Sequence, residues 1–365
     1  RQNVHKYNEE GEFIALLGYE WTMRAVQGGH HNVLFRTPER DRVPIQEAPI
    51  LSELYRRLAT ENDEDDVLII PHAHEPGDYR YSHPRMEPLV EIMSMHGRHE
   101  WFGQEYLKHG QQVGFIAASD DHLSHPGYVS PTTRGLADSG GLAAVWAPEK
   151  TTDALFDAMK NRHTYATTGE RIIVDFTLNG TPMGQRLDYS PERKLSIRVI
   201  GTGPLDSVMI VKNGQDIWTQ DLLVEENDAG DERFAKLTFA SPSDPVIRDS
   251  PRAWRLWQGE LEVHGAALSA VVSHSLYNPR SESLEPVQGK RGSLRFWAMT
   301  RGSEKSIILK LKGVSERRGI LVTLEPTVER YSTPSPIRRP AELPGQKIAL
   351  SFRDAAAGQA VEKIQ

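Results

Sequence analysis

The chain has 365 residues, of which 38% are hydrophobic and 25% are charged, and its formal net charge is −7. This length is typical of two globular domains, and the apolar runs are far shorter than the roughly 20 residues that cross a bilayer. The composition therefore indicates a soluble protein without a membrane-spanning segment, in an undetermined compartment. The negative charge and the lack of a Lys/Arg block argue against nucleic-acid binding. Because the chain has no cysteine, a metal site has to use His, Asp and Glu.

The first part of the chain alternates short apolar runs with helix-like segments, which is the pattern of α/β proteins. Strands are predicted at Phe13–Tyr19, Asn32–Phe35, Val67–Ile70, Leu89–Met93, Gly114–Ala118 and Leu142–Trp146. Residues 48–61 and 151–162 predict two outer helices, because their apolar residues recur on one helical face.

After Ile172 the pattern changes to short strand-like runs separated by Gly, Asn, Pro and Ser, which is typical of an antiparallel β-sandwich. Within it, Asn213-Gly214 predicts a type I′ hairpin turn, since both residues tolerate a positive φ. We therefore expect one domain over residues 1–172 and a β-sandwich domain over residues 173–365.

Histidines are concentrated in the first domain, where eleven of the fourteen lie between residues 30 and 163. Glu20, His72 and Asp120 each follow a predicted strand at or near its carboxyl end. In a barrel of parallel strands the carboxyl ends carry the active site, so these side chains are expected to converge. Carboxylates and imidazoles without thiolates are typical ligands of Zn, Mn or Fe, and such cations relieve the repulsion between the carboxylates.

Five segments carry a resemblance to a known family: LLGYEW, GHHNVLF, IIPHAHEPG, SDDH and ALFDAMKNRHTYATTGERI. Over nearly its whole length the chain resembles the domain-of-unknown-function 3604 family, a branch of the polymerase-and-histidinol-phosphatase (PHP) superfamily. The resemblance implies a distorted (β/α)₇ barrel that binds up to three metal ions and hydrolyses phosphoesters. The expected fold class is therefore α/β: a partial PHP-type, TIM-like barrel followed by an antiparallel β-sandwich.

The same resemblance implies a set of metal ligands, namely Glu20, His31, His72, Asp120 and His122. The alternative is that His30 is the ligand and that its neighbour His31 donates a hydrogen bond that orients a ligand. Further ligands, or groups that orient the ligands, are expected among His74, Glu91, His96 and His125. Residues 123–141 form a long connection that is expected to act as a lid.

The expected reaction is attack on a small phosphorylated substrate by a water that the metals activate. Candidate phosphate-binding residues are Arg98, Arg134 and Arg171. Two alternatives stay open: a metal-dependent hydrolase of another bond, such as an amide, and a non-catalytic protein with a remnant site. In the latter, the sandwich would bind carbohydrate or a partner, although its tryptophans are expected to be core residues: Trp218, Trp254, Trp257 and Trp297.

The first two metal-binding motifs of the superfamily, a His-x-His and an Asp-His, are expected ahead of Glu20, where the chain offers only His5. We therefore expect this chain to be the C-terminal portion of a longer protein. Its missing N-terminal segment is then an expected partner that completes both the barrel and the metal site. The chain alone is expected to bind metal weakly and to be inactive or poorly active.

Overall fold

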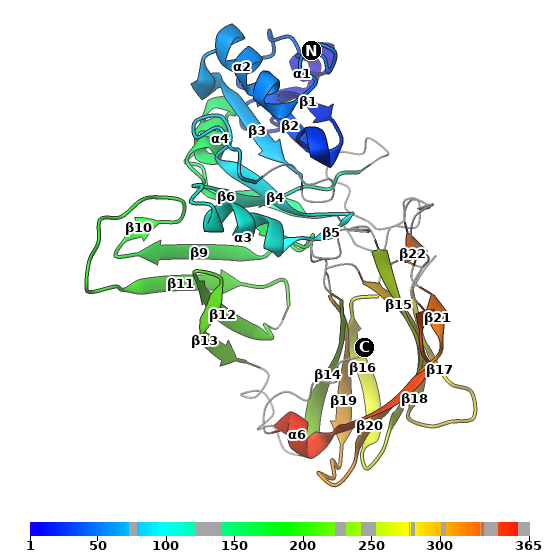
Figure 1. Cartoon of the computed structure of the whole chain (residues 1–365). Helices are drawn as coiled ribbons and strands as arrows, with labels where there is room; N and C mark the ends of the chain where they lie inside the picture. The colour runs from blue at the N-terminus through cyan, green and yellow to red at the C-terminus, as the bar shows by residue number, and fades with distance from the viewer. Residues whose placement is uncertain are drawn as a thin grey trace. The chain divides into compact units, whose positions relative to one another are not determined.

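The computed structural model divides the chain into two compact units, one up to Thr202 and one from Gly203 onward (Figure 1). The residues that the structure describes are 1–72, 79–121, 140–203, 205–222, 231–241, 253–276, 278, 282–300, 304–328, 330–331 and 342–356. The sequence pattern changes earlier, near residue 172, so the first strands of the strand-rich part belong to the first unit. No helix among these residues is long and apolar enough to cross a membrane.

The first unit consists of short strands grouped in several small sheets, with helices between them. Its helices are α1 (Gln2–Tyr7), η1 (Ala25–Gln27), α2 (Leu51–Glu61), η2 (Glu64–Asp66), α3 (Glu100–Lys108) and α4 (Thr152–Lys160). Its strands are β1 (Leu17–Thr22), β2 (His30–Phe35), β3 (Val67–Pro71), β4 (Leu89–Ser94), β5 (Gly97–Arg98), β6 (Gly114–Ala117), β7 (Leu142–Val145), β8 (Thr164–Thr167), β9 (Ile173–Leu178), β10 (Thr181–Pro182) and β11 (Leu195–Ile200).

Strand β3 is buried on both faces, which explains its uninterrupted apolar sequence. Val67 and Ile69 lie in one cluster with the apolar face of α2, whereas Leu68 and Ile70 lie in another with Phe156 of α4. Helix α4 begins where the Thr151 hydroxyl accepts a hydrogen bond from the backbone N–H of Ala154. The strand is therefore held between two helices, and its end is a rigid support for the side chains that follow.

The prediction of a partial (β/α)₇, TIM-like barrel is wrong. Strands β1, β2 and β3 form an antiparallel sheet, whereas such a barrel requires every neighbouring pair to be parallel. Among the described strands the parallel ladder is β4 with β6, and one further parallel bridge joins His72 to Glu91. The physical reason is the connection between β1 and β2, which is too short for the dozen or more residues that a parallel crossover needs.

The second unit is built from antiparallel strands. A hairpin joins β12 (Ser207–Lys212) to β13 (Gln215–Asp221). One sheet has the order β14-β19-β16, and a larger one the order β17-β18-β15-β20-β24 with β22 beside β15. The bounds are β14 (Glu232–Ala240), β15 (Ala253–Val263), β16 (Ala267–His274), β17 (Ser283–Pro286), β18 (Ser293–Thr300), β19 (Glu304–Lys312), β20 (Gly319–Leu324), β21 (Thr327–Val328), β22 (Arg330–Tyr331), β23 (Glu342–Leu343) and β24 (Gln346–Ser351), followed by α6 (Phe352–Ala356).

Both larger sheets contribute to a single apolar cluster, as the two layers of a β-sandwich do. The predicted turn at Asn213-Gly214 is confirmed, because both residues have a positive φ and connect paired strands. Trp257 is half-buried and packs against this cluster, as expected of a core residue, and its indole donates to the Thr300 hydroxyl at 2.8 Å. Trp297 is half-buried. Trp218 is 45% exposed on β13, and the side chain of Trp254 lies outside the described residues.

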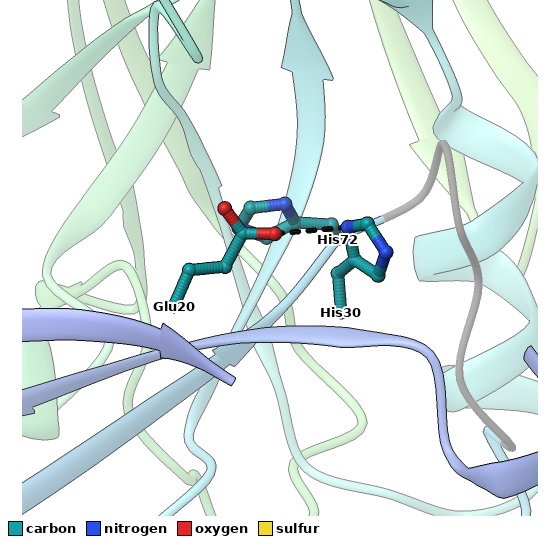
Figure 2. Close-up of side chains that lie close together, drawn as sticks. All are labelled: Glu20, His30 and His72. Atoms are coloured by element: carbon teal, nitrogen blue, oxygen red, sulfur yellow. Dashed lines mark ion pairs between the residues drawn. The ribbon is translucent and has the colours of Figure 1, made fainter. Parts of the chain in front are cut away.

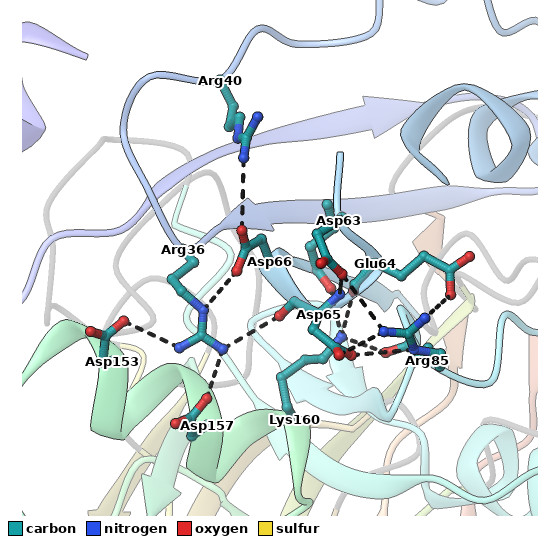
Figure 3. A network of polar contacts seen from close by, with 11 residues as sticks. Arg36, Arg40, Asp63, Glu64, Asp65, Asp66, Arg85, Asp153, Asp157 and Lys160 are labelled. Atoms are coloured by element: carbon teal, nitrogen blue, oxygen red, sulfur yellow. Dashed lines mark hydrogen bonds and ion pairs between the residues drawn. The ribbon is translucent and has the colours of Figure 1, made fainter. Parts of the chain in front are cut away.

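Helix α4 is fixed to the sheet by a network of charged side chains (Figure 3). The Arg36 guanidinium, at the end of β2, donates to Asp66, Asp153 and Asp157 at 3.0, 3.2 and 2.7 Å. At the other end of the helix, the Lys160 ammonium donates to the backbone carbonyls of Glu64, Val67 and Arg85. Burial lowers the pKa of Lys160 to about 8.

Replacement of Lys160 by methionine removes the ammonium and leaves three carbonyls to find other donors. We expect Lys160→Met to lower the free energy of unfolding by about 2–4 kcal/mol, measured by urea titration. Lys108→Met is the matched control, because the Lys108 ammonium pairs with Glu105 on an exposed face, where an ion pair contributes about 0–1 kcal/mol. Equal losses in the two variants would show that the three carbonyl contacts contribute little.

Candidate metal centre

Five side chains of the first unit converge in two groups that share His72: Glu20, His30 and His72 in one, and His72, Glu91 and Asp120 in the other. Within each group, one potential ligand atom per residue lies within 4.8 Å of the others. Figure 2 shows Glu20, His30 and His72 facing one another, with the Glu20 Oε1 atom 2.9 Å from Nδ1 of His30. In the second group, Nε2 of His72 lies 3.9 Å from Oε2 of Glu91.

The pairing of the strands brings these residues together. Because β1 and β2 are antiparallel, the end of β1 lies beside the start of β2, and Thr22 is opposite His30. The backbone N–H of His72, directly after β3, donates to the His30 carbonyl at 2.9 Å. His72 in turn bridges to Glu91 of β4, and Asp120 follows the neighbouring strand β6. The site therefore lies beside β4, where the end of β1, the start of β2 and the residues that follow β3 and β6 meet.

The carboxylates of this cluster are held in different electrostatic states. The hydrogen bond from His30 lowers the pKa of Glu20 to about 2, and the nearby His72 adds to the effect. Burial raises the pKa of Glu91 well above its ordinary value, and the charges of Asp120 and Glu20 raise it further. Burial also lowers the pKa of His72, which favours the neutral imidazole that binds metals. A divalent cation would relieve the repulsion among the three carboxylates.

His96 supports Asp120 from the β4–β5 turn. Its Nε2 atom lies 3.1 Å from Oδ2 of Asp120. Asp120 itself has a φ of 48°, a left-handed conformation that few residues other than glycine adopt. A histidine that holds a carboxylate in this way fixes its orientation, as groups around metal sites do for metal ligands.

His31 lies outside the two groups, because successive residues of β2 face opposite sides of the strand. It is fully buried, and its ring meets the Trp21 ring edge-on with centroids 5.8 Å apart. Its Nε2 atom is 3.9 Å from Oε2 of Glu87, which also accepts a hydrogen bond from the Tyr55 hydroxyl. Of the two adjacent histidines, His30 and not His31 therefore lies with Glu20 and His72.

His31 and Glu87 are not an ion pair at neutral pH. Burial lowers the pKa of His31 to about 3, and the charges of His72 and His30 act in the same direction. Burial raises the pKa of Glu87 to about 8. Both groups are therefore neutral near pH 7, and the contact is part of the packing between β2 and the segment that precedes β4.

Four of the predicted site residues lie outside the described residues: His74, His122, His125 and Arg134, together with nearly all of the predicted lid. Arg98 lies on β5, opposite Met93 of β4, and its Nε atom is 3.5 Å from Glu100. Arg171 is exposed between β8 and β9. The sequence offers Glu91 and His30 only as alternatives or additions to the main ligand set, and the signal for Glu91 is a carboxylate inside the otherwise apolar run LVEIMSM.

Comparison with known proteins relates the first unit to one family. Residues 1–108 and 125–181 match the family described as "Protein of unknown function (DUF3604)". The matched residues include Glu20, His30, His72 and Glu91, whereas Asp120 lies between the two matched segments. No solved structure matches the chain.

Three uncharacterized proteins of Chlamydia species are similar to this chain. The protein from Chlamydia pneumoniae is 29% identical over 252 residues, which are 60% of this chain and 40% of that protein. The protein from Chlamydia muridarum is 27% identical over 279 residues, 67% of this chain and 44% of the relative. The protein from Chlamydia trachomatis is 28% identical over 246 residues, which are 58% of this chain and 39% of that protein. The chain therefore spans about two fifths of the length of these relatives.

The neutral state of Glu87 predicts a dependence of stability on pH. The pKa of Glu87 is about 8 in the folded protein and lies above the ordinary 4.5. The contribution of neutral Glu87 to the free energy of unfolding is therefore complete below pH 4.5 and is lost as the pH rises through 8. Glu87→Gln keeps the shape of the neutral side chain but cannot ionise. We therefore expect the variant to lack this fall in the free energy of unfolding, which amounts to at most about 1.4 kcal/mol per pH unit. The measurement is urea unfolding of both proteins at several pH values.

The exposed Glu12 supplies the control, as Glu12→Gln. A difference between wild type and Glu87→Gln that stays constant from pH 5 to pH 8 would contradict the neutral assignment, and so would a pH-dependent difference of the same size in the control.

Proposed function

We propose that this protein is a metal-dependent phosphoesterase of the PHP superfamily, and that Glu20, His30, His72, Glu91 and Asp120 hold its divalent cations. The observation that carries the proposal is the pair of groupings that share His72, each with three potential oxygen or nitrogen ligands within 4.8 Å. Such a donor set, without thiolates, suits Zn²⁺, Mn²⁺ or Fe²⁺. The motifs that resemble the superfamily support the same proposal.

The residues of the chain have separate tasks in this proposal. Glu20 and Asp120 are oriented by His30 and His96, at 2.9 and 3.1 Å. Cations at this position would acidify a bound water and neutralise charge on a phosphoryl oxygen. Arg98 lies on the hairpin that carries Glu91 and His96, so its guanidinium is a candidate contact for an anionic substrate. The proposed substrate is a small phosphate ester.

A substrate panel with matched variants tests the proposal. The protein is assayed with Mn²⁺ or Zn²⁺ on phosphomonoesters, phosphodiesters and amides, and bound metal is measured by elemental analysis. We expect phosphoester hydrolysis, and we expect His72→Gln to lower metal affinity more than about 100-fold, beyond the 10–100-fold typical of groups that only orient ligands. His109→Gln, at the exposed end of α3, is the control and should change neither.

Hydrolysis of amides alone would contradict the phosphoesterase proposal but leave the metal centre intact. Equal metal content in His72→Gln and wild type would contradict the metal centre itself.

Proton release on metal binding tests the role of Glu91 separately. Because burial and neighbouring carboxylates raise the pKa of Glu91, a cation that binds this carboxylate is expected to displace a proton from it. We expect metal binding to release more protons in wild type than in Glu91→Gln, and to weaken as the pH falls. Calorimetry in buffers of different ionisation enthalpy measures the release, and equal release in both proteins would exclude Glu91 as a ligand.

A further inference from the structure

The β-sandwich of the second unit contains a lysine at a core position. Along β19, the buried residues alternate with less buried ones, and Lys305 takes its place in the same series as Ile307, Leu309 and Leu311. Its side chain is 4% exposed. A lysine in this series needs a specific partner, because a buried charge without one is costly.

The partner is Glu282, whose side chain is fully buried next to the start of β17. Its Oε1 atom lies 3.3 Å from the Lys305 amine and accepts from the backbone N–H of Met299 at 3.4 Å. Its Oε2 atom accepts from the backbone N–H of Asn278 at 3.0 Å. The carboxylate therefore holds the lysine amine on one oxygen and the backbone of Asn278 on the other.

Asn278 is itself fully buried and doubly attached to Glu282, since its carbonyl accepts from the Glu282 backbone N–H at 2.7 Å. Leu276 and Ile307, which are two residues from Asn278 and Lys305 in sequence, belong to the apolar core of the sandwich, and so does Ala298, the neighbour of Met299. The Lys305 amine and the backbone of Asn278 thus contact the same buried carboxylate. Reactive groups held at one buried site can replace many orders of magnitude in concentration.

We propose that Lys305 and Asn278 join through an intramolecular isopeptide bond, with Glu282 as the group that transfers protons. The Lys305 ammonium gives one proton to the Glu282 carboxylate, and the free amine attacks Cγ of Asn278. A bond forms between Nζ and Cγ, the bond from Cγ to the amide nitrogen breaks, and Glu282 carries a second proton from Nζ to the departing nitrogen. Ammonia leaves, Glu282 ends protonated, and no oxidant or cofactor is consumed.

The charges explain why this reaction is favourable in the core. Before the reaction, the site holds one positive and one negative group, and removing both from water is costly. Afterwards it holds a neutral amide and a neutral acid that can hydrogen-bond to each other. The escape of ammonia into solvent further favours the product.

The residue after Asn278 removes the usual competing reaction of asparagine. In most sequences, the next backbone N–H attacks Cγ and forms a succinimide. Pro279 has no backbone N–H, so that route is closed at this position. The Cγ atom of Asn278 is therefore preserved for a different nucleophile.

Mass spectrometry of the full chain decides the proposal. We expect the intact protein to be lighter than its sequence by the mass of one ammonia molecule. A tryptic digest should contain one branched peptide that joins residues 256–280 to residues 302–310, uncut after Lys305. A full-length mass equal to that of the sequence, with a free Lys305 peptide, would overturn the proposal without the need for any variant.

Variants separate the bond from other losses of ammonia. Lys305→Met, Asn278→Ala and Glu282→Gln should each restore the full mass and lower the melting temperature, because the cross-link no longer restricts the unfolded chain. Asn213→Ala removes the Asn213-Gly214 pair, where succinimide formation gives the same mass change, and should leave the branched peptide intact. A mass loss that disappears in Asn213→Ala, without a branched peptide in wild type, would assign the change to Asn213 and overturn the proposal.

Discussion

The crowding of three carboxylates at one edge of the first unit is the constraint on which the account depends. Glu20, Glu91 and Asp120 all interact with one another or with His72, and Glu91 is almost fully buried. Rigid packing maintains this unfavourable arrangement, because β3 is held between α2 and α4 and cannot withdraw His72 from it. Polar groups kept together at such a cost are characteristic of functional sites.

The sequence predicted the place of the site better than the architecture around it. Glu20, His72 and Asp120 could be recognised because each follows or ends an apolar strand, and strand ends are where rigid backbone meets solvent. The sequence did not show in the same way whether neighbouring strands pair in parallel or antiparallel. The predicted strands at residues 13–19 and 32–35 left room for a crossover, whereas β1 extends to Thr22 and β2 begins at His30, which leaves room only for a hairpin connection.

The choice between His30 and His31 shows a second limit of sequence reasoning. Two adjacent residues of a strand face opposite sides, so an error of one position exchanges a residue at the cluster for one in the core. The motif contains both histidines, and only the register with β1 and the packing of Trp21 place His31 among apolar side chains. The paired histidines therefore divide between two environments, one polar and partly buried and one fully buried.

The two units contain two different solutions to buried charge. In the first unit, carboxylates of like charge lie close together, and a bound cation would relieve the repulsion between them. In the second, the buried Lys305 amine lies 3.3 Å from the Glu282 carboxyl group, and the proposed bond would replace both charges by neutral groups. The relatives from Chlamydia extend well beyond the region that matches this chain.

Anomalous X-ray diffraction from Zn²⁺-loaded crystals tests the central claim most directly. The account predicts an anomalous peak about 2.0–2.2 Å from a His72 nitrogen and from ligand atoms of Glu20 and His30 or of Glu91 and Asp120. A peak coordinated by His31 and Glu87, or full zinc loading with no peak at His72, would contradict it.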